Sequence, residues 1–215
     1  MTREELIKKV ALKMDEISSS DDVQVPVVES DNNPLYTQIN YLLNESVNDV
    51  LMKAPIFRIQ KQIATIKEYK EKELFNKTRK AVVFAIPNNF LRLVSITDSI
   101  FQRPIVDLAL EGDDIDKRQH NKFLVAKYAK PIAIIGQGST GKTITCYSYD
   151  IDYAPNPSLN YIKRYEQDLD YFSDTNLDGY LTDIVSWLCA GKVFAAQGDV
   201  NKGKICDENA AALMI

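Results

Sequence analysis

The residues with the clearest chemical potential form a glycine-rich run, Gly-Gln-Gly-Ser-Thr-Gly-Lys-Thr, from Gly136 to Thr143. This run matches the phosphate-loop pattern G-x-x-x-x-G-K-[ST], in which backbone amides and a lysine hold the phosphates of a nucleotide. The candidate phosphate-binding residues are Gly136, Gly141, Lys142 and Thr143. Their chemistry requires a helix directly after the loop, because the amides and the dipole of its first turn bind the phosphates.

The residues that follow Lys142 do not favour such a helix. They read Thr-Ile-Thr-Cys-Tyr-Ser-Tyr, and prolines stand at positions 155 and 157. β-Branched and aromatic residues of this kind prefer strands. No apolar strand ending in Asp supplies a magnesium ligand either. The sequence therefore predicts a flexible hairpin turn, and a nucleotide-binding protein that uses Gly136–Thr143 is the alternative function.

A second partial motif begins at Asp174. Asp174, Asn176 and Asp178, followed by Gly179, occupy the first, third, fifth and sixth positions of an EF-hand calcium loop. Val185 stands where the loop needs a bidentate glutamate, so two carboxylate oxygens are lost. These acids have a simpler use at the start of the helix that follows them. We predict no metal site and no cofactor.

Acid–base and nucleophile chemistry has little support. The single histidine, His120, lies in the polar run Lys-Arg-Gln-His-Asn, which is typical of an exposed helix, and no partner is identified by spacing. The cysteines Cys146, Cys189 and Cys206 are too few and too scattered for a disulfide framework or a zinc site. We predict that the protein is not an enzyme.

Helices are predicted at both ends of the chain. Thr2 and Glu5 have the spacing of a capping box, and apolar residues recur at helical spacing over residues 3–17. Asn33-Pro34 begins a longer helix that Pro55 limits. Another apolar face extends from Leu177 to Val193 and ends at Gly198, and Asp199 can cap a last helix that reaches about Leu213.

The middle of the chain favours strands. Residues 81–86 and 90–96 are predicted strands around a turn, and residues 132–135 and 143–149 form a second pair. A short surface helix is expected within 108–121, whereas 56–80 suits either a helix or a strand. The prediction is an α+β fold in a single domain, 1–215, with helices in 1–55 and 177–215 and a β-rich portion at about 80–160.

The amino-acid composition and the charge of the chain exclude several classes of protein. Hydrophobic residues make up 45% of 215 residues, as in globular proteins, and the longest stretch without a charge has 13 residues. A membrane span needs about 17 to 25 apolar residues, and the N-terminus lacks the layout of a signal peptide. We therefore expect no membrane association and a reducing compartment. The net charge of −4 argues against a general nucleic-acid binder.

Charge is distributed unevenly. Residues 57–80 contain eight Lys or Arg and three Glu, whereas residues 150–183 contain eight Asp or Glu and two basic residues. Two solvated faces would explain this distribution. The other interpretation is head-to-tail pairing, in which a basic edge of one subunit meets an acidic edge of the next.

Four segments of the chain resemble, in order, the head-to-tail adaptor or ring proteins of short-tailed phages, also called tail tubular protein A-like proteins. Ile39–Pro55 is similar to an early helix of that family, and Ile86-Pro87-Asn88-Asn89-Phe90-Leu91-Arg92-Leu93-Val94 is similar to its "LP-D-F-LR-LV" strand, with Asn89 where the family often has Asp. The other two segments are Gln119–Asn121 with Lys130–Ala133, and Val193–Asp199. The composition of the chain, which is rich in Lys, Asn and Ile, also resembles that of ring proteins of crAss-like phages.

This resemblance implies a structural role without catalysis. About twelve copies would form a ring between the portal and the tail. The ring would extend the DNA channel and serve as a platform for other ring or tail proteins. The expected partners are further copies of the chain, the portal protein and those tail components, while genomic DNA passes without specific binding. The expected location is the neck or tail of the virion, after assembly in the host cytoplasm.

Overall fold

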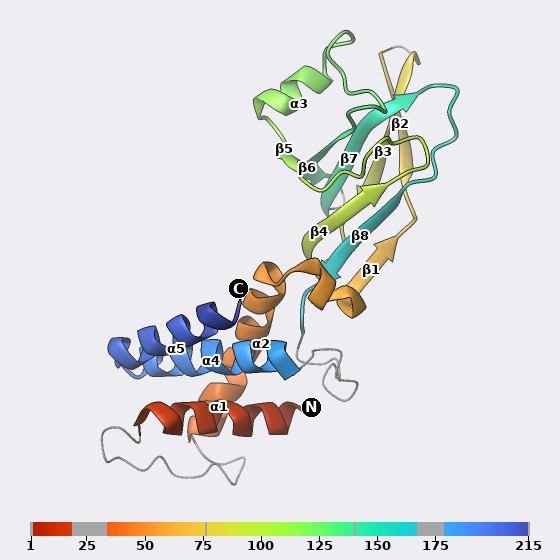
Figure 1. Ribbon diagram of the computed structural model, residues 1–215. Helices are drawn as coiled ribbons and strands as arrows, with labels where there is room; N and C mark the ends of the chain where they lie inside the picture. Colours follow the sequence, from red (N-terminus) through yellow and green to blue (C-terminus); the bar gives the residue numbers. More distant parts are fainter. Residues whose placement is uncertain (1, 19–33, 76, 140, 167–178, 215) are drawn as a thin grey trace. The chain divides into compact units, whose positions relative to one another are not determined.

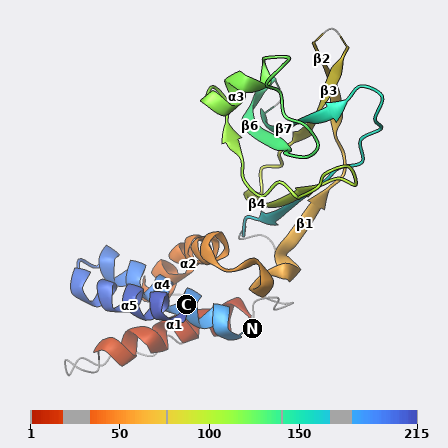
Figure 2. The same cartoon turned by 45° about the horizontal axis from the view of Figure 1, so that its top comes forward.

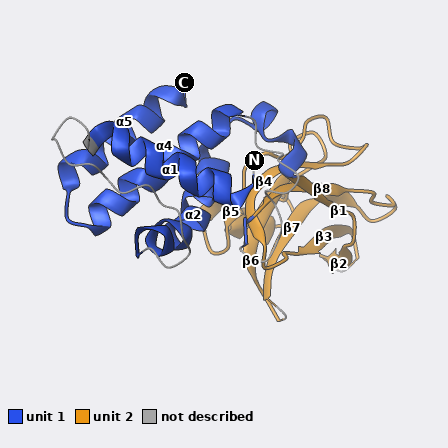
Figure 3. Cartoon of the chain, turned by 90° about the horizontal axis from the view of Figure 1, so that it is seen from below, with its two compact units in different colours: residues 1–62, 164–215 blue, residues 63–163 orange. Residues whose placement is uncertain are grey.

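The computed structural model describes residues 2–18, 34–75, 77–139, 141–166 and 179–214 (Figure 1). The fold is α+β, as predicted, and combines five α-helices with two β-sheets in these residues. The chain divides into two compact units, which Figure 3 colours separately. Unit 1 comprises residues 1–62 and 164–215, and unit 2 comprises residues 63–163.

Unit 1 is helical, and its central element is α4. Its α-helices are α1 (Arg3–Ser18), α2 (Pro34–Lys53), α4 (Gly179–Ala196) and α5 (Val200–Leu213), with the short 3-10 helices η2 (Ile56–Arg58) and η3 (Gln60–Gln62) after α2. Helix α4 contacts the other three α-helices, and it is apolar around most of its circumference. A helix that is apolar on all sides belongs in a core. The hydroxyls of Thr182 and Ser186 are accommodated there because each donates to a carbonyl one turn earlier.

Polar contacts fix the helices of unit 1 to one another. The Arg3 guanidinium in α1 donates to the Asn40 side chain at 2.6 Å and to the Asn44 side chain at 2.9 Å, both in α2. Lys192 in α4 bonds Asp49 of α2 at 2.7 Å and also pairs with Glu45. Charged hydrogen bonds such as these are stronger than neutral ones, so they help to set the positions of α1 and α4 on α2.

Unit 2 contains two antiparallel sheets with one short parallel pair. The three-stranded sheet has the order β1-β8-β4 and the five-stranded sheet has the order β2-β3-β7-β6-β5, in which β5 and β6 are parallel. Figure 2 shows both sheets from a second direction. The elements are β1 (Ile63–Ile66), β2 (Lys70–Leu74), β3 (Arg79–Ala85), β4 (Phe90–Thr97), β5 (Ala109–Leu110), α3 (Asp114–Gln119), β6 (Ile132–Gly138), β7 (Gly141–Asp150) and β8 (Ser158–Lys163).

Alternating residues of the five-stranded sheet divide between two apolar clusters. Val82 and Phe84 of β3 pack with Leu159 and Tyr161 of β8, so one face of this sheet meets the three-stranded sheet. The opposite face is covered by residues 125–126, which follow α3 and pack against neighbouring strands. The period of two along a strand produces this division, and it makes the connection between β4 and β6 part of the fold.

The predicted helices and the four predicted strands are confirmed. In the capping box at the start of α1, Thr2 N donates to Glu5 Oε2 at 2.8 Å and Glu5 N donates to Thr2 Oγ1 at 3.2 Å. Asp199 caps α5 by accepting from Lys202 N at 3.1 Å. The region 56–80, which the sequence left open, forms short 3-10 helices and then strands.

Two features of the β region could not be predicted from local sequence, because they depend on the tertiary fold. Strands β3 and β4 follow one another across Pro87–Asn89, but they belong to different sheets and do not pair with each other. The short helix expected within 108–121 is limited to Asp114–Gln119. None of the described helices combines the length and hydropathy that a bilayer-spanning segment needs.

Candidate interaction surfaces

The glycine-rich run Gly136–Thr143 forms the end of a β-hairpin between β6 and β7. Gln137 pairs with Lys142, and Gly138 pairs with Gly141 next to the turn. Gly141 has φ +135°, a conformation that a side chain would strain. Strand β7 continues from Gly141 to Asp150, which confirms the predicted hairpin. Because a strand follows Lys142 and Thr143, no helix N-terminus is available at this loop to bind phosphate.

An acidic side chain occupies the backbone donor that a phosphate would use. Glu111 Oε2 accepts a hydrogen bond from Gln137 N at 2.8 Å. Gly136 permits this approach, because a Cβ atom there would lie 2.4 Å from the same carboxylate oxygen. The carboxylate satisfies an amide in the middle of the motif and would repel a phosphate group. The local electrostatics therefore do not favour a nucleotide at this hairpin.

The partial calcium loop lies outside the described residues, since Asp174, Asn176 and Asp178 belong to 167–178. In the part of the chain that the structure describes, no group of three His, Cys, Asp or Glu side chains could hold a metal ion.

The surroundings of the histidine and of the three cysteines indicate structural roles for these side chains. His120 Nε2 lies 3.4 Å from Asp116 Oδ1, while Asp116 Oδ2 accepts from the backbone of Gly112 at 2.9 Å. The three cysteines are free and buried. Burial raises the pKa of the Cys189 and Cys206 thiols to about 12. Because the thiolate is the reactive form, these groups are inert near neutral pH.

The basic stretch 57–80 is partly neutralised within unit 2. Lys80 is buried and lies 3.1 Å from Glu71, and Arg79 lies 3.4 Å from Asp150. Lys77 pairs with Glu73 at 3.8 Å. The stretch also belongs to both units, because residues 57–62 are part of unit 1 and residues 63–80 are part of unit 2. The pairing of Arg79 with Asp150 joins the basic and acidic stretches inside one chain.

A different segment concentrates both exposed apolar groups and positive charge. Twelve large apolar side chains are exposed among the described residues, and six of them lie in the connection between β4 and β6: Val106, Leu110, Ile115, Phe123, Leu124 and Tyr128. We call residues 117–130 the basic loop, because they include five Lys or Arg and no Asp or Glu. Phe123 is 88% exposed, which is the largest value among these apolar side chains.

The basic loop is held on unit 2 by buried contacts. Gln119 is almost fully buried, and its Oε1 accepts from Ala126 N at 2.9 Å while its Nε2 donates to Ile115 O at 2.9 Å. Val125 and Ala126 pack on the outer face of the five-stranded sheet. Asn121 Oδ1 accepts from Phe123 N at 2.9 Å. Buried anchors on both sides of Phe123 and Leu124 thus keep these two residues on the surface.

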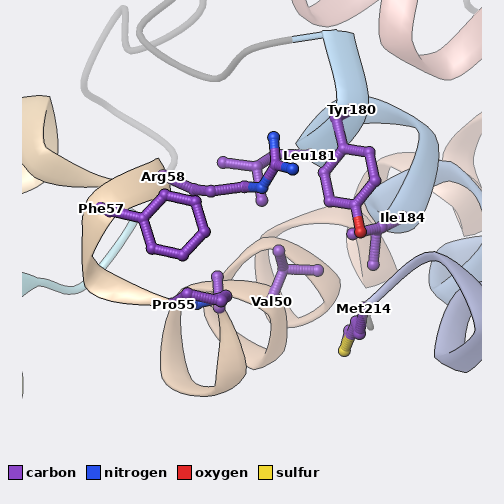
Figure 4. Close-up of a pocket in the computed structure, with 9 residues that line it drawn as sticks. Val50, Pro55, Phe57, Arg58, Tyr180, Leu181, Ile184 and Met214 are labelled. Carbon is purple, nitrogen blue, oxygen red and sulfur yellow. The ribbon is translucent and has the colours of Figure 1, made fainter.

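A small cavity of about 40 Å³ lies within unit 1, near the end of α2 (Figure 4). The Arg58 guanidinium lies 4.1 Å from the ring centre of Tyr180 and 5.5 Å from that of Phe57, and Ile184 and Met214 are among the apolar residues of the wall. Ligand pockets usually measure about 300–1,000 Å³. This cavity has room for a few water molecules or the tip of one side chain, so it does not fit a cofactor.

Comparison of the chain with protein-family profiles gives no match, and comparison with curated proteins gives no relative.

The sequence interpretation missed the basic loop, although a signal for it was present. Residues 108–121 were interpreted as a polar surface helix, and the exposed Phe123-Leu124 pair lies just beyond that range. The run of five basic residues without an acid was the available signal. It was obscured by the stretch 57–80, which has more basic residues but also contains their acidic partners.

Proposed function

We propose that this protein is a structural subunit that assembles into a ring between the portal and the tail of a short-tailed phage. The ring extends the DNA channel and provides a platform on which tail components assemble. The protein performs no catalysis in this role. It acts by presenting surfaces to further copies of itself, to the portal protein and to other ring or tail proteins.

The exposed apolar side chains of the β4–β6 connection carry this proposal. Single exposed apolar residues are common on soluble proteins, but six within the 23 residues from 106 to 128 are characteristic of an interaction surface. Burial of a Phe side chain contributes about 1.5–3 kcal/mol, so Phe123 alone could supply a substantial part of a subunit contact. A protein whose chemistry takes place in a pocket would not need this surface.

The positions of three of the four resembling segments also support the proposal. Ile39–Pro55 covers most of α2, and Phe90–Val94 lies in β4. Val193–Asp199 forms the junction between α4 and α5, where Gly198 has φ +89°. These are structural elements and a helix junction, so the resemblance concerns the framework of the protein. A structural subunit of an assembly needs a defined shape and surfaces that contact its neighbours, and it needs no reactive group.

The acidic balance of the chain suits a channel through which DNA passes. The net charge of −4 disfavours tight binding to phosphates, because binding to DNA is dominated by neutralisation of its backbone charge. A channel that released DNA slowly would hinder ejection. We therefore propose that DNA is a passing neighbour of the ring.

The test is the mass of the purified protein in solution, measured by light scattering at low and high salt, alone and with the matching portal protein. A ring of about twelve copies, free or on the portal, is expected. A protein that stays monomeric under all these conditions would refute the proposal. Binding of ATP that disappears in Lys142→Ala would instead favour the nucleotide-binding alternative.

A further inference from the structure

We propose that the connection between β4 and β6 joins neighbouring copies of the chain, with the acidic segment of one copy bound to the basic loop of the next. The acidic segment is residues 106–116, which contain five Asp or Glu and no Lys or Arg. The basic loop follows it at 117–130 and contains five Lys or Arg and no Asp or Glu, so the two formal charges are equal and opposite. This inference rests on the proposed function, because it identifies the surfaces by which identical chains assemble.

Most of the charge of the basic loop has no acidic partner within the chain. Lys117 pairs with Asp114 at 3.1 Å, and both side chains are exposed. Among the described residues, no ion pair involves the four other bases of the loop, which are all exposed: Arg118, Lys122, Lys127 and Lys130. Unpaired surface charge of one sign attracts and orients a partner of the opposite sign.

The acidic segment retains its negative charge because its carboxylates bond mainly to neutral backbone amides. Glu111 Oε2 accepts from Gln137 N at 2.8 Å, and Asp113 Oδ1 accepts from Asp116 N at 2.7 Å at the start of α3. Backbone amides hold these carboxylates in place without cancelling their charge. Asp107 is exposed, and its side chain forms no ion pair with another described residue. The acidic segment therefore presents negative charge in fixed positions.

Both segments also expose large apolar side chains. The acidic segment exposes Val106, Leu110 and Ile115, and the basic loop exposes Phe123, Leu124 and Tyr128. Interfaces commonly have an aromatic or apolar centre within a polar rim. A contact between the two segments would remove apolar side chains of both copies from water while it pairs their opposite charges.

The two segments occupy different parts of the five-stranded sheet, so they can face different neighbours. The acidic segment contains β5, which is one edge of this sheet. The basic loop is anchored on the outer face of the sheet by Val125 and Ala126, and Gln119 Oε1 accepts from Ala126 N at 2.9 Å. A contact between two different surfaces of the same chain is heterologous, and such contacts can close into a ring. Each copy then contributes its acidic segment to one neighbour and its basic loop to the other.

A second copy of the chain fits this connection better than a nucleic acid does. Nucleic acids bind mainly through neutralisation of their phosphates. The basic loop would attract phosphates, but the acidic segment next to it in the chain would repel them, and the formal charges of the two segments cancel. The aliphatic side chains of Leu110, Ile115 and Leu124 gain nothing from stacking on bases. Another copy supplies both the opposite charges and the apolar area.

The first test is cross-linking between two single-substitution variants, Asp107→Cys and Lys122→Cys. Both replaced side chains are exposed and the three native cysteines are buried, so the introduced thiols are the accessible ones. After the variants are mixed under conditions that give the ring, a flexible bis-maleimide should link them to each other. Lys72→Cys is the matched control for Lys122→Cys, because Lys72 is an exposed lysine of β2, at the opposite edge of the same sheet from β5. It should not link to Asp107→Cys.

The cross-linked products distinguish failure of this inference from failure of the proposed function. A link between the mixed variants, with products of more than two chains from the variant that carries both cysteines, would support the contact. Products limited to two chains would show a closed pair and overturn the head-to-tail contact. A sample that light scattering shows to be a ring but that gives no link would overturn the inference and leave the proposed function intact. A protein that remains monomeric with and without portal would refute both.

The second test reverses the charge of each segment in turn. Asp107→Lys with Asp114→Lys should weaken assembly by roughly tenfold or more, and Lys122→Glu with Lys127→Glu should do the same. Mixing the two double variants should restore assembly with alternating copies, because every contact then joins opposite charges. Two misfolded proteins could not rescue each other in this way. Failure of the mixture to assemble, when each variant keeps the circular dichroism spectrum of the wild type, would overturn the inference.

The same variants test nucleic acid as the partner. The probe is a double-stranded DNA oligonucleotide, and we expect the wild type not to retain it. Retention that Lys122→Glu with Lys127→Glu abolishes, with assembly unchanged, would assign the basic loop to nucleic acid and overturn the inference.

Discussion

Replacement of Asp98 by alanine should destabilise unit 2 selectively, because this carboxylate organises two connections of the β unit. Its Oδ1 accepts from Tyr153 OH at 2.8 Å, from Ile100 N at 3.2 Å and from Ser99 Oγ at 3.3 Å. Its Oδ2 accepts from Asn156 N at 2.9 Å and from Tyr149 OH at 3.2 Å. The side chain therefore joins the segment after β4 to the segment between β7 and β8.

The magnitude depends on which donors can reach water after the substitution. Asn156 is exposed and Tyr153 is half-buried, so their donors can be solvated at small cost. Tyr149 is fully buried, and its hydroxyl would lose its partner inside the core. An unsatisfied buried group costs about 1–3 kcal/mol, and each hydrogen bond to a charged acceptor contributes about 1.5–3 kcal/mol. We expect Asp98→Ala to lower the free energy of unfolding by about 3–4 kcal/mol, and Asp98→Asn by about half as much.

Urea denaturation followed by near-ultraviolet circular dichroism of the tyrosines measures this loss. The single tryptophan, Trp187, lies in α4 and reports on unit 1 by fluorescence. Amide exchange should accelerate most in peptides that contain residues 98–101 and 149–156. Ser99→Ala is the control, because its hydroxyl bond to Asp98 is long and its other partner is the half-buried Tyr153, so it should cost less than about 1 kcal/mol. Equal stabilities for Asp98→Ala and Ser99→Ala would refute this reasoning.

Other expectations concern unit 1 and the hairpin. Asn48 accepts from Tyr165 N at 2.7 Å and donates to Tyr165 O at 3.1 Å, so Asn48→Asp should lower the urea midpoint by more than Asn48→Ala, since a carboxylate would face a carbonyl. An equal midpoint for the two variants would contradict this. Burial raises the pKa of Cys189 and Cys206 to about 12, so the thiols ionise first in the unfolded chain. The unfolded state then binds fewer protons, and stability should fall from about pH 9 to pH 12 by roughly 1 kcal/mol per pH unit for each thiol, a slope that Cys206→Ala should reduce in denaturation curves. Calorimetric titration with Mg-ATP should give no saturable heat for the wild type or for Lys142→Ala, because β7 follows the loop.

The elements that local sequence determines were predictable. The hairpin of β6 and β7 was predictable because two runs of β-branched residues flank a glycine-rich turn. In the structure Gly138 pairs with Gly141 at the end of this hairpin. Helix α1 was predictable because its capping box and apolar spacing agree. Agreement between local signals is what allows a single sequence to be interpreted.

Strand partners could not be obtained in this way. The turn at Pro87–Asn89 suggests neighbouring strands, yet β4 pairs with β8, which lies more than 60 residues later in the chain. The residues of 56–80 were ambiguous because their partners, β3 and β8, are provided by the tertiary fold. The role of Asp98 was invisible for the same reason, since its tyrosine partners are more than 50 residues distant in sequence.

The sheet edges indicate how such a protein can associate with copies of itself and still avoid uncontrolled aggregation. Strand β2 is one edge of the five-stranded sheet, and its exposed residues alternate Lys70, Glu71, Lys72 and Glu73. The other edge, β5, has only two residues. Charged or very short edge strands oppose the addition of further strands. Association through backbone pairing is therefore disfavoured at both edges of this sheet. Side chains of the connections remain as the means of contact, and the basic loop is the connection that offers both charge and apolar area. An assembly built in this way should dissociate as salt rises, because its specificity depends on exposed charges that salt screens.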